Sequence, residues 1–583
     1  MEYDAIVIGS GFGGAPVVLR LAEAGYRVLV LERGRRWQAP DVDPTPGNEA
    51  RRRESTLYPR AKDDPWIYDA DNPAKSSGWV ELRRFSGMWV VNGAGVGGGS
   101  LHFSNVSVEP STASFGQGWP KPFRDDPSLL GPYVERVGQT LGVEPLPENQ
   151  LTERNKLVRE AHQSLGLAPE RLRQLPLTVR FDGNFELERA DGDDPRQAKF
   201  TQPAINEHGI QTGTCVHLGN CNIGCDVNAR KILDTNYLPA AEALGAEIRP
   251  LHLVRWIMPV DGGYEVHFDK IDPGTETTEQ GKISARIVVL SCGSMGSTEL
   301  LLRCRDVHHT LPELSRHLGK NWSPNGDFFT PANYDRPLHL AQGPPITAAV
   351  DYVDEPDAGG QRYFIQDVGF PNVLGGWVRE KMGGTGGGGL VSRMFKYAAD
   401  TLAHADDSDD DSNDASDGDT PFDKLMIWFA QGQDAADGEM RLRRKYFFGL
   451  FGPKELELRW DSQRSQPNFE AIGATQKKFT EATGGRTLAP FNLGKFPEFL
   501  ASFHPLGGCN MADPAGEGVV YESHGRRRRT DEGVVGHHGE VFGYRNLYVS
   551  DGSVIPEAIG RNPSRTIAAV AERIAEMIVQ EGR

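Results

Sequence analysis

Residues Tyr3–Gly14 read YDAIVIGSGFGG and set the architecture of the chain. The apolar run that ends at Ile8 is typical of a buried strand, and three glycines follow it in G-x-G-x-x-G spacing. In this arrangement Gly9 makes the tight turn, Gly11 lets the backbone approach a pyrophosphate, and Gly14 packs a helix on the strand. The stretch therefore predicts a dinucleotide-binding unit.

The residues that follow support this interpretation. We expect a helix over 16–24, closed by Gly25, and a second strand over 27–31 that ends in Glu32. The helix N-terminus would supply N–H groups and a positive dipole for a diphosphate. Glu32 is placed to accept hydrogen bonds from the adenosine ribose, which disfavours a 2′-phosphate. A glycine turn without a ligand is the alternative, and the fingerprint alone leaves both FAD and NAD open.

More nucleotide-type turns are scattered along the chain. Residues 92–110 read NGAGVGGGSLHFSNVSVEP, residues 285–303 combine a strand, a glycine turn and a helix start, and residues 546–553 form another strand that ends at Asp551. A large cofactor threaded through one domain would need several such turns. These segments therefore favour FAD over NAD.

The C-terminal part holds the candidate reactive groups. HPLGGC begins at His504, an Asp-Gly-Ser turn begins at Asp551, and GRNP begins at Gly560. Together with the N-terminal glycines these motifs resemble the glucose–methanol–choline (GMC) oxidoreductases, and within them the cholesterol-oxidase-like branch. The other matching segments are GAGVGGGSL at Gly93, the Cys-rich run Cys215–Lys231, LGKNWSPNGD at Leu318 and NLYVSDGSVIPEAIGRNPSRTIAAVAER at Asn546.

The resemblance implies an α/β fold, α+β overall, with two domains. A Rossmann-like FAD-binding domain would be built from the discontinuous segments 1–110, 211–325 and 491–583. Segments 111–210 and 326–490 would form a substrate-binding domain with a β-sheet cover, which we expect over 438–460. Within this domain, 383–389 is a glycine-rich segment expected to be flexible, and the acidic loop 406–419 is too polar to order itself.

The cofactor implied by the resemblance is FAD. Asp551 would meet the ribityl hydroxyls, with helix capping as the alternative, and the backbone of Val254 would meet the adenine. The expected cofactor-binding residues are Gly9, Gly11, Phe12, Gly14, Glu32, Gly93, Gly97, Gly98, Ser100, His102, Val254, Asp551, Gly552 and Asn562.

The resemblance also places a histidine and an asparagine over the reactive flavin ring, and these fall on His504 and Asn562. Alcohol oxidation removes a hydroxyl proton and a hydride, and a histidine can take that proton near neutral pH. We expect His504 to act as the general base and Asn562 to hydrogen-bond the same oxygen. The alternatives are a core histidine at a turn and an ordinary Asn-Pro turn.

His102 raises a separate question. Its place after Gly-Gly-Gly-Ser-Leu resembles loops of choline and pyranose oxidases, in which a histidine is bonded covalently to the flavin. In the sterol-oxidase branch FAD is often held without such a bond. A covalent flavin and a non-covalent flavin-side histidine therefore both stay open.

The expected reaction is oxidation of a secondary hydroxyl on a sterol-like or other bulky alcohol, with oxygen or another electron acceptor. A sugar or glycoside oxidase is the alternative that His102 would favour. A flavin-containing lyase of the same fold and a non-catalytic flavin protein belong to other classes. Only the resemblance to one branch suggests a sterol.

Length, net charge and cysteine content limit the domain number, the partners and the metal sites that the chain is expected to have. A chain of 583 residues is expected to form two domains. Its net charge of −17 argues against a nucleic-acid partner. Neither a secretory signal nor an apolar run long enough to span a bilayer is visible, so we expect a cytoplasmic protein without an integral membrane segment. The run Cys215–Cys225 has three cysteines, too few for a usual zinc or iron–sulfur site, so we expect no metal.

Overall fold

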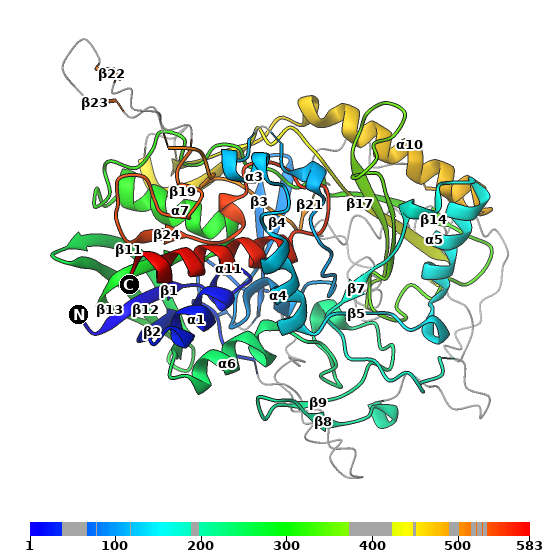
Figure 1. The fold of residues 1–583 in the computed structure, drawn as a ribbon, viewed down its shortest axis with the longest axis horizontal. Coiled ribbons are helices and arrows are strands. Elements are labelled where there is room, and N and C mark those ends of the chain that lie inside the picture. The colour runs from blue at the N-terminus through cyan, green and yellow to red at the C-terminus, as the bar shows by residue number, and fades with distance from the viewer. Residues whose placement is uncertain are drawn as a thin grey trace.

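The computed structural model describes residues 1–37, 67–76, 78–116, 118–187, 198–371, 423–446, 451–488, 501–514, 520–521, 527–528 and 533–582. The segments expected to be flexible (383–389) and acidic and unordered (406–419) lie outside the described residues. The described residues are organised around two sheets (Figure 1).

The first sheet is the expected nucleotide-binding one. Its parallel strands lie in the order β10-β2-β1-β13-β24, and β12 and β11 extend it in antiparallel fashion. The strands are β1 (Tyr3–Ile8), β2 (Val28–Leu31), β10 (Glu247–Arg249), β11 (His252–Val260), β12 (Gly263–Asp272), β13 (Thr277–Leu290) and β24 (Leu547–Val549). The α/β fold class is thus confirmed, and the two ends of the chain meet in one sheet.

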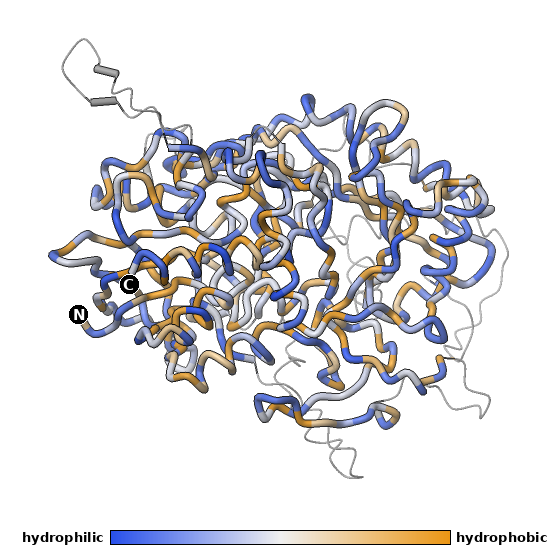
Figure 2. The backbone as a smooth tube through the Cα atoms, viewed as in Figure 1, coloured by the Kyte–Doolittle hydropathy of each residue, from blue (hydrophilic) through white to orange (hydrophobic). Residues whose placement is uncertain are grey.

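Helices cover this sheet because its central strands are apolar on both faces. All four residues of β2 are buried, which is typical of parallel strands between two layers. Figure 2 shows hydrophobic stretches gathered inside the molecule and hydrophilic ones along its outline. The covering helices are α1 (Gly14–Glu23), α4 (Gly131–Leu141), α6 (Tyr237–Ala243), α7 (Gly293–Asp306) and α11 (Ser564–Glu581).

One of these helices belongs to a different domain from the one that the sequence predicts. Helix α4 packs against α11, and Val134, Val137 and Leu141 are buried in the same core as the strands of the first sheet. The sequence predicts that the whole segment 111–210 belongs to the substrate-binding domain. Its first part instead belongs to the core of the nucleotide-binding domain, because the apolar stripe of α4 is buried there.

The second sheet is antiparallel and has six strands in the order β20-β14-β17-β16-β15-β6. Helices α5 (Glu153–Ser164) and α10 (Gln466–Ala482) pack on one face through an apolar cluster around Trp428 and Phe469. The opposite face carries Phe329 and Phe429. The strands are β6 (Leu172–Gln174), β14 (Phe328–Asn333), β15 (Ala348–Asp351), β16 (Tyr363–Val368), β17 (Leu425–Gly432) and β20 (Arg486–Thr487).

The β-sheet cover expected over 438–460 is wrong in its position. That segment forms the hairpin β18 (Glu439–Tyr446)–β19 (Phe451–Arg459), which lies outside the second sheet. Met440 and Leu458 pack with Trp322 in the core of the first domain, so the hairpin extends that core. The sheet near the candidate site is the six-stranded one.

A small three-stranded sheet leads to the candidate histidine. In it β21 (Ala501–Ser502) pairs with β4 (Met88–Gly93), which also pairs with β3 (Val80–Phe85). The remaining helix and strands are short: α3 (Lys121–Asp125), β5 (Glu144–Pro145), β7 (Pro176–Leu177), β8 (Ala204–Ile205), β9 (Gln211–Thr212), β22 (Val520–Tyr521) and β23 (Arg527–Arg528).

Candidate active site

Two glycine-rich loops face each other at the end of β1. A Cβ atom on Gly9 would lie 2.4 Å from Ser291 O, and one on Gly14 would lie 2.1 Å from Gly9 O, so neither position accepts a side chain. A Cβ on Gly98 would lie 2.7 Å from the Cα of Gly11. The two loops therefore approach with only backbone between them, as the sequence predicts for a loop that admits a pyrophosphate.

The start of α1 offers free donors. The helix is capped by Gly13 without a side-chain bond. Among the described residues, no protein acceptor takes a hydrogen bond from the backbone N–H of Gly11, Phe12 or Gly13. Unsatisfied N–H groups at a helix N-terminus are suited to a phosphate. This part of the structure fits the diphosphate of FAD.

Ser10, which we did not predict, connects the two loops to Glu32. Its hydroxyl donates to Glu32 Oε2 at 2.8 Å and accepts from the N–H of Gly97 at 3.1 Å. The other Glu32 oxygen accepts from the N–H of Gly34 at 3.0 Å, and burial raises the pKa of this carboxyl. Strand β11, which carries Val254, begins beside Glu32, since the N–H of His252 donates to the Glu32 carbonyl. The two predicted adenosine contacts are thus neighbours.

The second glycine loop is held in place by an arginine from the Cys-rich run. Arg230 donates to the carbonyls of Ser100, at 2.5 Å, and Leu101, at 2.9 Å. The Ser100 hydroxyl donates in turn to Gly97 O at 2.7 Å. Sequence reasoning missed Arg230 because the cysteines that precede it are the recognisable feature of this run.

Two further predicted residues pack at this loop. A Cβ on Gly93 would lie 2.5 Å from the carbonyl carbon of Gly98, so the loop turns tightly there. The ring of Phe12 meets Phe103 edge-on at 5.3 Å, which joins the first loop to the second. These contacts are structural, and whether either residue meets a flavin remains a prediction.

His102 lies at the end of this loop with an unused ring nitrogen. Its Nδ1 is buried and has no hydrogen-bond partner in the described part of the chain. Burial, with Arg230 and His504 nearby, lowers the pKa of His102 to about 4. The imidazole is therefore neutral at pH 7 and has a free lone pair or N–H to offer. This suits a flavin neighbour, with or without a covalent bond.

Both carboxylate oxygens of Asp551 accept hydrogen bonds from backbone N–H groups, as helix-capping residues do. Its Oδ2 accepts from the N–H of Gly293, at the start of α7, and from the Ser297 hydroxyl. Its Oδ1 accepts from the N–H and hydroxyl of Ser553. The capping alternative is therefore present in the structure, and a contact with the ribityl chain remains a prediction. The next residue, Gly552, accepts from the N–H of Gly507 and so touches the HPLGGC turn.

His504 is paired with a buried carboxylate. Its Nδ1 lies 2.7 Å from Asp327 Oδ1, and the other Asp327 oxygen accepts from the N–H of Phe503 at 2.7 Å. The Asp327 side chain is fully buried, whereas that of His504 is 18% exposed. Burial raises the pKa of Asp327, and the neighbouring His504 opposes that shift. With Nδ1 held in this way, Nε2 is left for a ligand.

Asn562 is held by the second sheet. Its Oδ1 accepts a short hydrogen bond from Nε2 of Gln366, which lies on β16. Gln366 is fully buried and Asn562 is 5% exposed. Sequence reasoning missed Gln366, although a glutamine inside the apolar strand YFIQDV is a signal, because buried amides need partners.

Two bridges bring His504 and Asn562 together. On the second sheet, Gln366 lies directly opposite Phe429 on the neighbouring strand. Phe429 stacks on the His504 ring with centroids 5.9 Å apart, while Gln366 bonds to Asn562. Directly opposite residues of an antiparallel pair have Cβ atoms about 5 Å apart. The two predicted catalytic side chains are therefore neighbours.

The second bridge is the turn that contains Asn325 and Asp327. Asn325 Nδ2 donates to the carbonyl of Arg561 at 2.8 Å, and its Oδ1 accepts from the N–H groups of Ile559 and Gly560. Asp327, two residues further along the turn, holds His504. One short turn thus fixes both loops that supply the candidate reactive groups.

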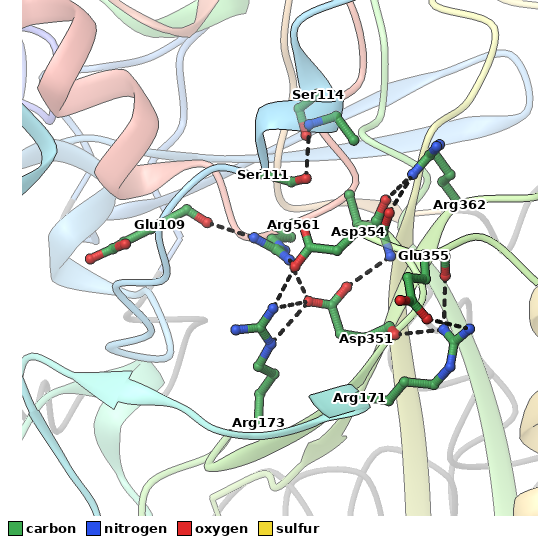
Figure 3. A network of polar contacts seen from close by, with 12 residues as sticks. Glu109, Ser111, Ser114, Arg171, Arg173, Asp351, Asp354, Glu355, Arg362 and Arg561 are labelled. Atoms are coloured by element: carbon green, nitrogen blue, oxygen red, sulfur yellow. Dashed lines mark hydrogen bonds and ion pairs between the residues drawn. The ribbon is translucent and has the colours of Figure 1, made fainter. Parts of the chain in front are cut away.

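A buried ion-pair network anchors the backbone next to Asn562 (Figure 3). The Arg561 guanidinium pairs with Asp351 and, at 2.7 Å, with Asp354. Arg173 on β6 binds the same two carboxylates. The side chains of Arg561 and Asp351 are almost completely buried. The loop of the first domain is therefore locked to the edge of the second sheet.

All six cysteines are free thiols. The described residues contain no group of three or more His, Cys, Asp or Glu side chains arranged to hold a metal. None of the helices in the described ranges is both long enough and apolar enough to cross a bilayer. A cytoplasmic location remains a prediction.

Comparisons with known proteins point to one family. The family model described as GMC oxidoreductase matches residues 525–571. The cholesterol oxidase of Acinetobacter baumannii is 26% identical over 99% of this chain and 94% of its own length. That of Mycobacterium tuberculosis (strain ATCC 25618 / H37Rv) is 26% identical over 100% of this chain and 92% of its own. Among solved structures, pyridoxine 4-oxidase from "Mesorbium loti" has the same fold, with a TM-score of 0.56 at 14% identity and 98% coverage of both chains.

Proposed function

We propose that this chain, which is similar to GMC oxidoreductases that act on CH–OH donors, is an FAD-dependent oxidase or dehydrogenase of a bulky secondary alcohol. The observation that carries the proposal is the neighbouring pair His504 and Asn562, each held by a buried polar partner. The pair lies where C-terminal loops meet the second sheet. FAD and the two catalytic roles are part of the proposal.

FAD would be held along the two glycine loops. The free N–H groups at the start of α1 suit its diphosphate, Glu32 suits its ribose, and the orphan Nδ1 of His102 suits the flavin end. When bound, FAD would supply the acceptor for the substrate hydride. The protein supplies orientation and proton transfer.

His504 would take the hydroxyl proton on Nε2. Its Nδ1 faces Asp327, which sets the tautomer and stabilises the imidazolium once the proton has moved. The Asn562 amide would hydrogen-bond the same substrate oxygen. Such a pair orients the alcohol and neutralises the charge that develops on its oxygen.

Aromatic side chains next to His504 suit a bulky apolar substrate. Phe329 and Phe429 stack at 4.4 Å, Phe503 meets Phe329 edge-on, and Phe503 is 43% exposed beside the catalytic histidine. The three phenylalanines give the site an apolar wall that a bulky apolar ligand could cover. Together with the similarity to cholesterol oxidases, this supports a sterol-like alcohol.

The test is anaerobic bleaching of the visible flavin band. A 3-hydroxysteroid, an aldohexose, an aryl glycoside and a long-chain primary alcohol are each mixed with the flavin-loaded enzyme. We expect the steroid to bleach it fastest. Bleaching by the aldohexose or the glycoside alone would move the substrate to sugars. No bleaching by any of the four would favour a lyase of the same fold.

The sugar or glycoside oxidase is kept as a second candidate because of His102. Its buried, neutral ring with a free Nδ1 is the arrangement that a covalent flavin bond would need. Acid precipitation distinguishes the two forms of attachment. Yellow colour in the pellet would show a covalent flavin, and colour confined to the supernatant would remove that idea.

A further inference from the structure

We propose that Gln366 is a positioning residue that turns the Asn562 amide so that its N–H groups face the substrate oxygen. The inference rests on the proposed alcohol oxidation and names a group that acts through Asn562 without touching substrate. It starts from one contact, the hydrogen bond from Gln366 Nε2 to Asn562 Oδ1.

An asparagine amide has two chemically different ends. Its oxygen only accepts hydrogen bonds and its nitrogen only donates them. Gln366 occupies the oxygen end of Asn562 with a donor. The end of Asn562 left for a ligand is therefore the donor end. Without Gln366, the two orientations of the amide would differ little in energy, and the side chain could present either end.

The reaction needs the donor end. A substrate hydroxyl has one proton, and His504 Nε2 takes it. If Asn562 presented its oxygen, two acceptors would face a substrate oxygen that is gaining negative charge. An N–H donor instead stabilises that charge, and removing one such donor from an enzyme typically costs about 10²–10³-fold in rate.

The second sheet gives Gln366 a fixed place. Gln366 is fully buried on β16 and lies opposite Phe429, which stacks on His504. The sheet therefore sets the position of the base with one strand and the direction of the amide with the next. Arg561 fixes the neighbouring backbone, so that the side-chain amide is the remaining degree of freedom.

The first experiment is a double-mutant cycle on flavin-loaded enzyme. Gln366→Met removes the donor at similar volume, and we expect the rate constant of anaerobic flavin reduction to fall roughly tenfold or more, with little change in KM. In an Asn562→Ala background the same substitution should have no further effect, since residues that act through one group are not additive. Losses that multiply in the double variant would overturn the proposal.

A matched control separates positioning from loss of stability. Gln476 on α10 is also fully buried, accepts from the Thr330 hydroxyl at 2.5 Å, and lies on the opposite side of the same sheet. Gln476→Met should lower the thermal midpoint by an amount similar to Gln366→Met while leaving flavin reduction unchanged. Equal losses of rate in both variants would make the role of Gln366 merely structural.

A second readout does not depend on any substrate. Crystal structures at about 1.2 Å or better allow the nitrogen and oxygen of an amide to be distinguished. In the wild-type enzyme Asn562 Oδ1 should face Gln366. In Gln366→Glu at a pH where the glutamate is ionised, Nδ2 should face it instead. An amide that does not turn, or a wild-type amide with Nδ2 toward Gln366, overturns the inference. If no alcohol reduces the wild-type flavin, the proposed function fails, and this pair of structures still decides on Gln366.

Discussion

The cofactor side of the candidate site is shaped by close contacts between backbone atoms, and the second-sheet side by contacts between side chains. On the cofactor side, backbone meets backbone: Gly9, Gly14 and Gly98 lie where a Cβ atom would collide with a neighbouring main chain. On the second-sheet side, side chains hold side chains: Asp327 holds His504, and Gln366 holds Asn562. The first kind of construction tolerates only glycine, so the sequence itself marks the positions. The second depends on which strands become neighbours.

The difference predicts how each side fails when it is mutated. Loss of a glycine should distort the place proposed for the cofactor, and so remove the flavin and lower the stability of the fold. Loss of a side chain on the second-sheet side should leave flavin bound and affect rate or stability alone. Four substitutions test this contrast.

Gly14→Val should have the largest effect. The new side chain would meet Gly9 O, and because the Gly9 N–H is bonded to Leu31 O and the Gly14 N–H to Gly11 O, the loop must open. Overpacking of this kind costs about 1–3 kcal/mol or more. We expect purified protein with little or no bound flavin, measured as the ratio of visible to ultraviolet absorbance. Gly131→Ala is the matched control, since nothing lies near its Cβ, and it should retain full flavin.

His504→Ala should keep the flavin and lose the reaction. Removing a general base typically costs about 10²–10⁴-fold, so turnover should fall by at least two orders of magnitude. The flavin spectrum should stay that of the wild type, because the ring contact and the hydrogen bond of His504 are made with Phe429 and Asp327 on the second-sheet side. A variant with an intact rate would place the base elsewhere, and a variant without flavin would break the contrast between the two sides.

Arg561→Leu should act mainly on stability. It leaves the buried Asp351 with Arg173 as its one ion-pair partner among the described residues. Breaking a buried pair costs about 3–5 kcal/mol, which should lower the thermal midpoint by several degrees. The control is Arg362→Leu in the same network: Arg362 donates to the carbonyls of Val353 and Asp354 (Figure 3). A midpoint equal in both variants would mean that the ion pair contributes little.

His102→Asn should have the smallest effect on the stability of the flavin-free protein, and this effect should be confined to acid. The pKa of His102 is lowered to about 4, below its ordinary value of 6.5, so on acidification the unfolded chain takes up the proton first. This residue therefore costs stability as pH falls from about 6.5 to about 4, and the variant should lose less stability over that range. Thermal midpoints of flavin-free protein at pH 7 and pH 4.5 provide the measurement. Equal losses in both proteins would contradict the shifted pKa.

The cofactor side was predictable because its close backbone contacts require glycines, and their spacing is visible in the sequence. The strand, turn and helix of residues 3–23, the acid at Glu32 and the late strand before Asp551 all lie where the sequence places them. The candidate pair His504 and Asn562 was found through motifs. Only the structure shows how the two side chains are linked through the second sheet.

The second-sheet side was less predictable because it is made by pairing of distant strands. Asp327 lies inside a recognised motif, yet its partner is set by a contact across 177 positions of the chain. Gln366 meets Asn562 across 196 positions. The strand pattern over 439–459 shows which residues share a face, but it does not show what that face packs against. The sequence alone therefore predicts a cover over the site. Tertiary packing places it on Trp322 instead.

The pairing of β24 with β13 has a consequence for synthesis. Ribosomes add about 5–20 residues per second, so β1 and β2 emerge on the order of half a minute to two minutes before β24. From the synthesis of β13 until that of β24, one edge of β13 has no parallel partner, and the helix that will cover α1 does not yet exist. During this interval the apolar edge of the nascent sheet must be kept from pairing with strands of other chains. Chaperone dependence and aggregation during expression should therefore decrease when translation of the last segment is fast.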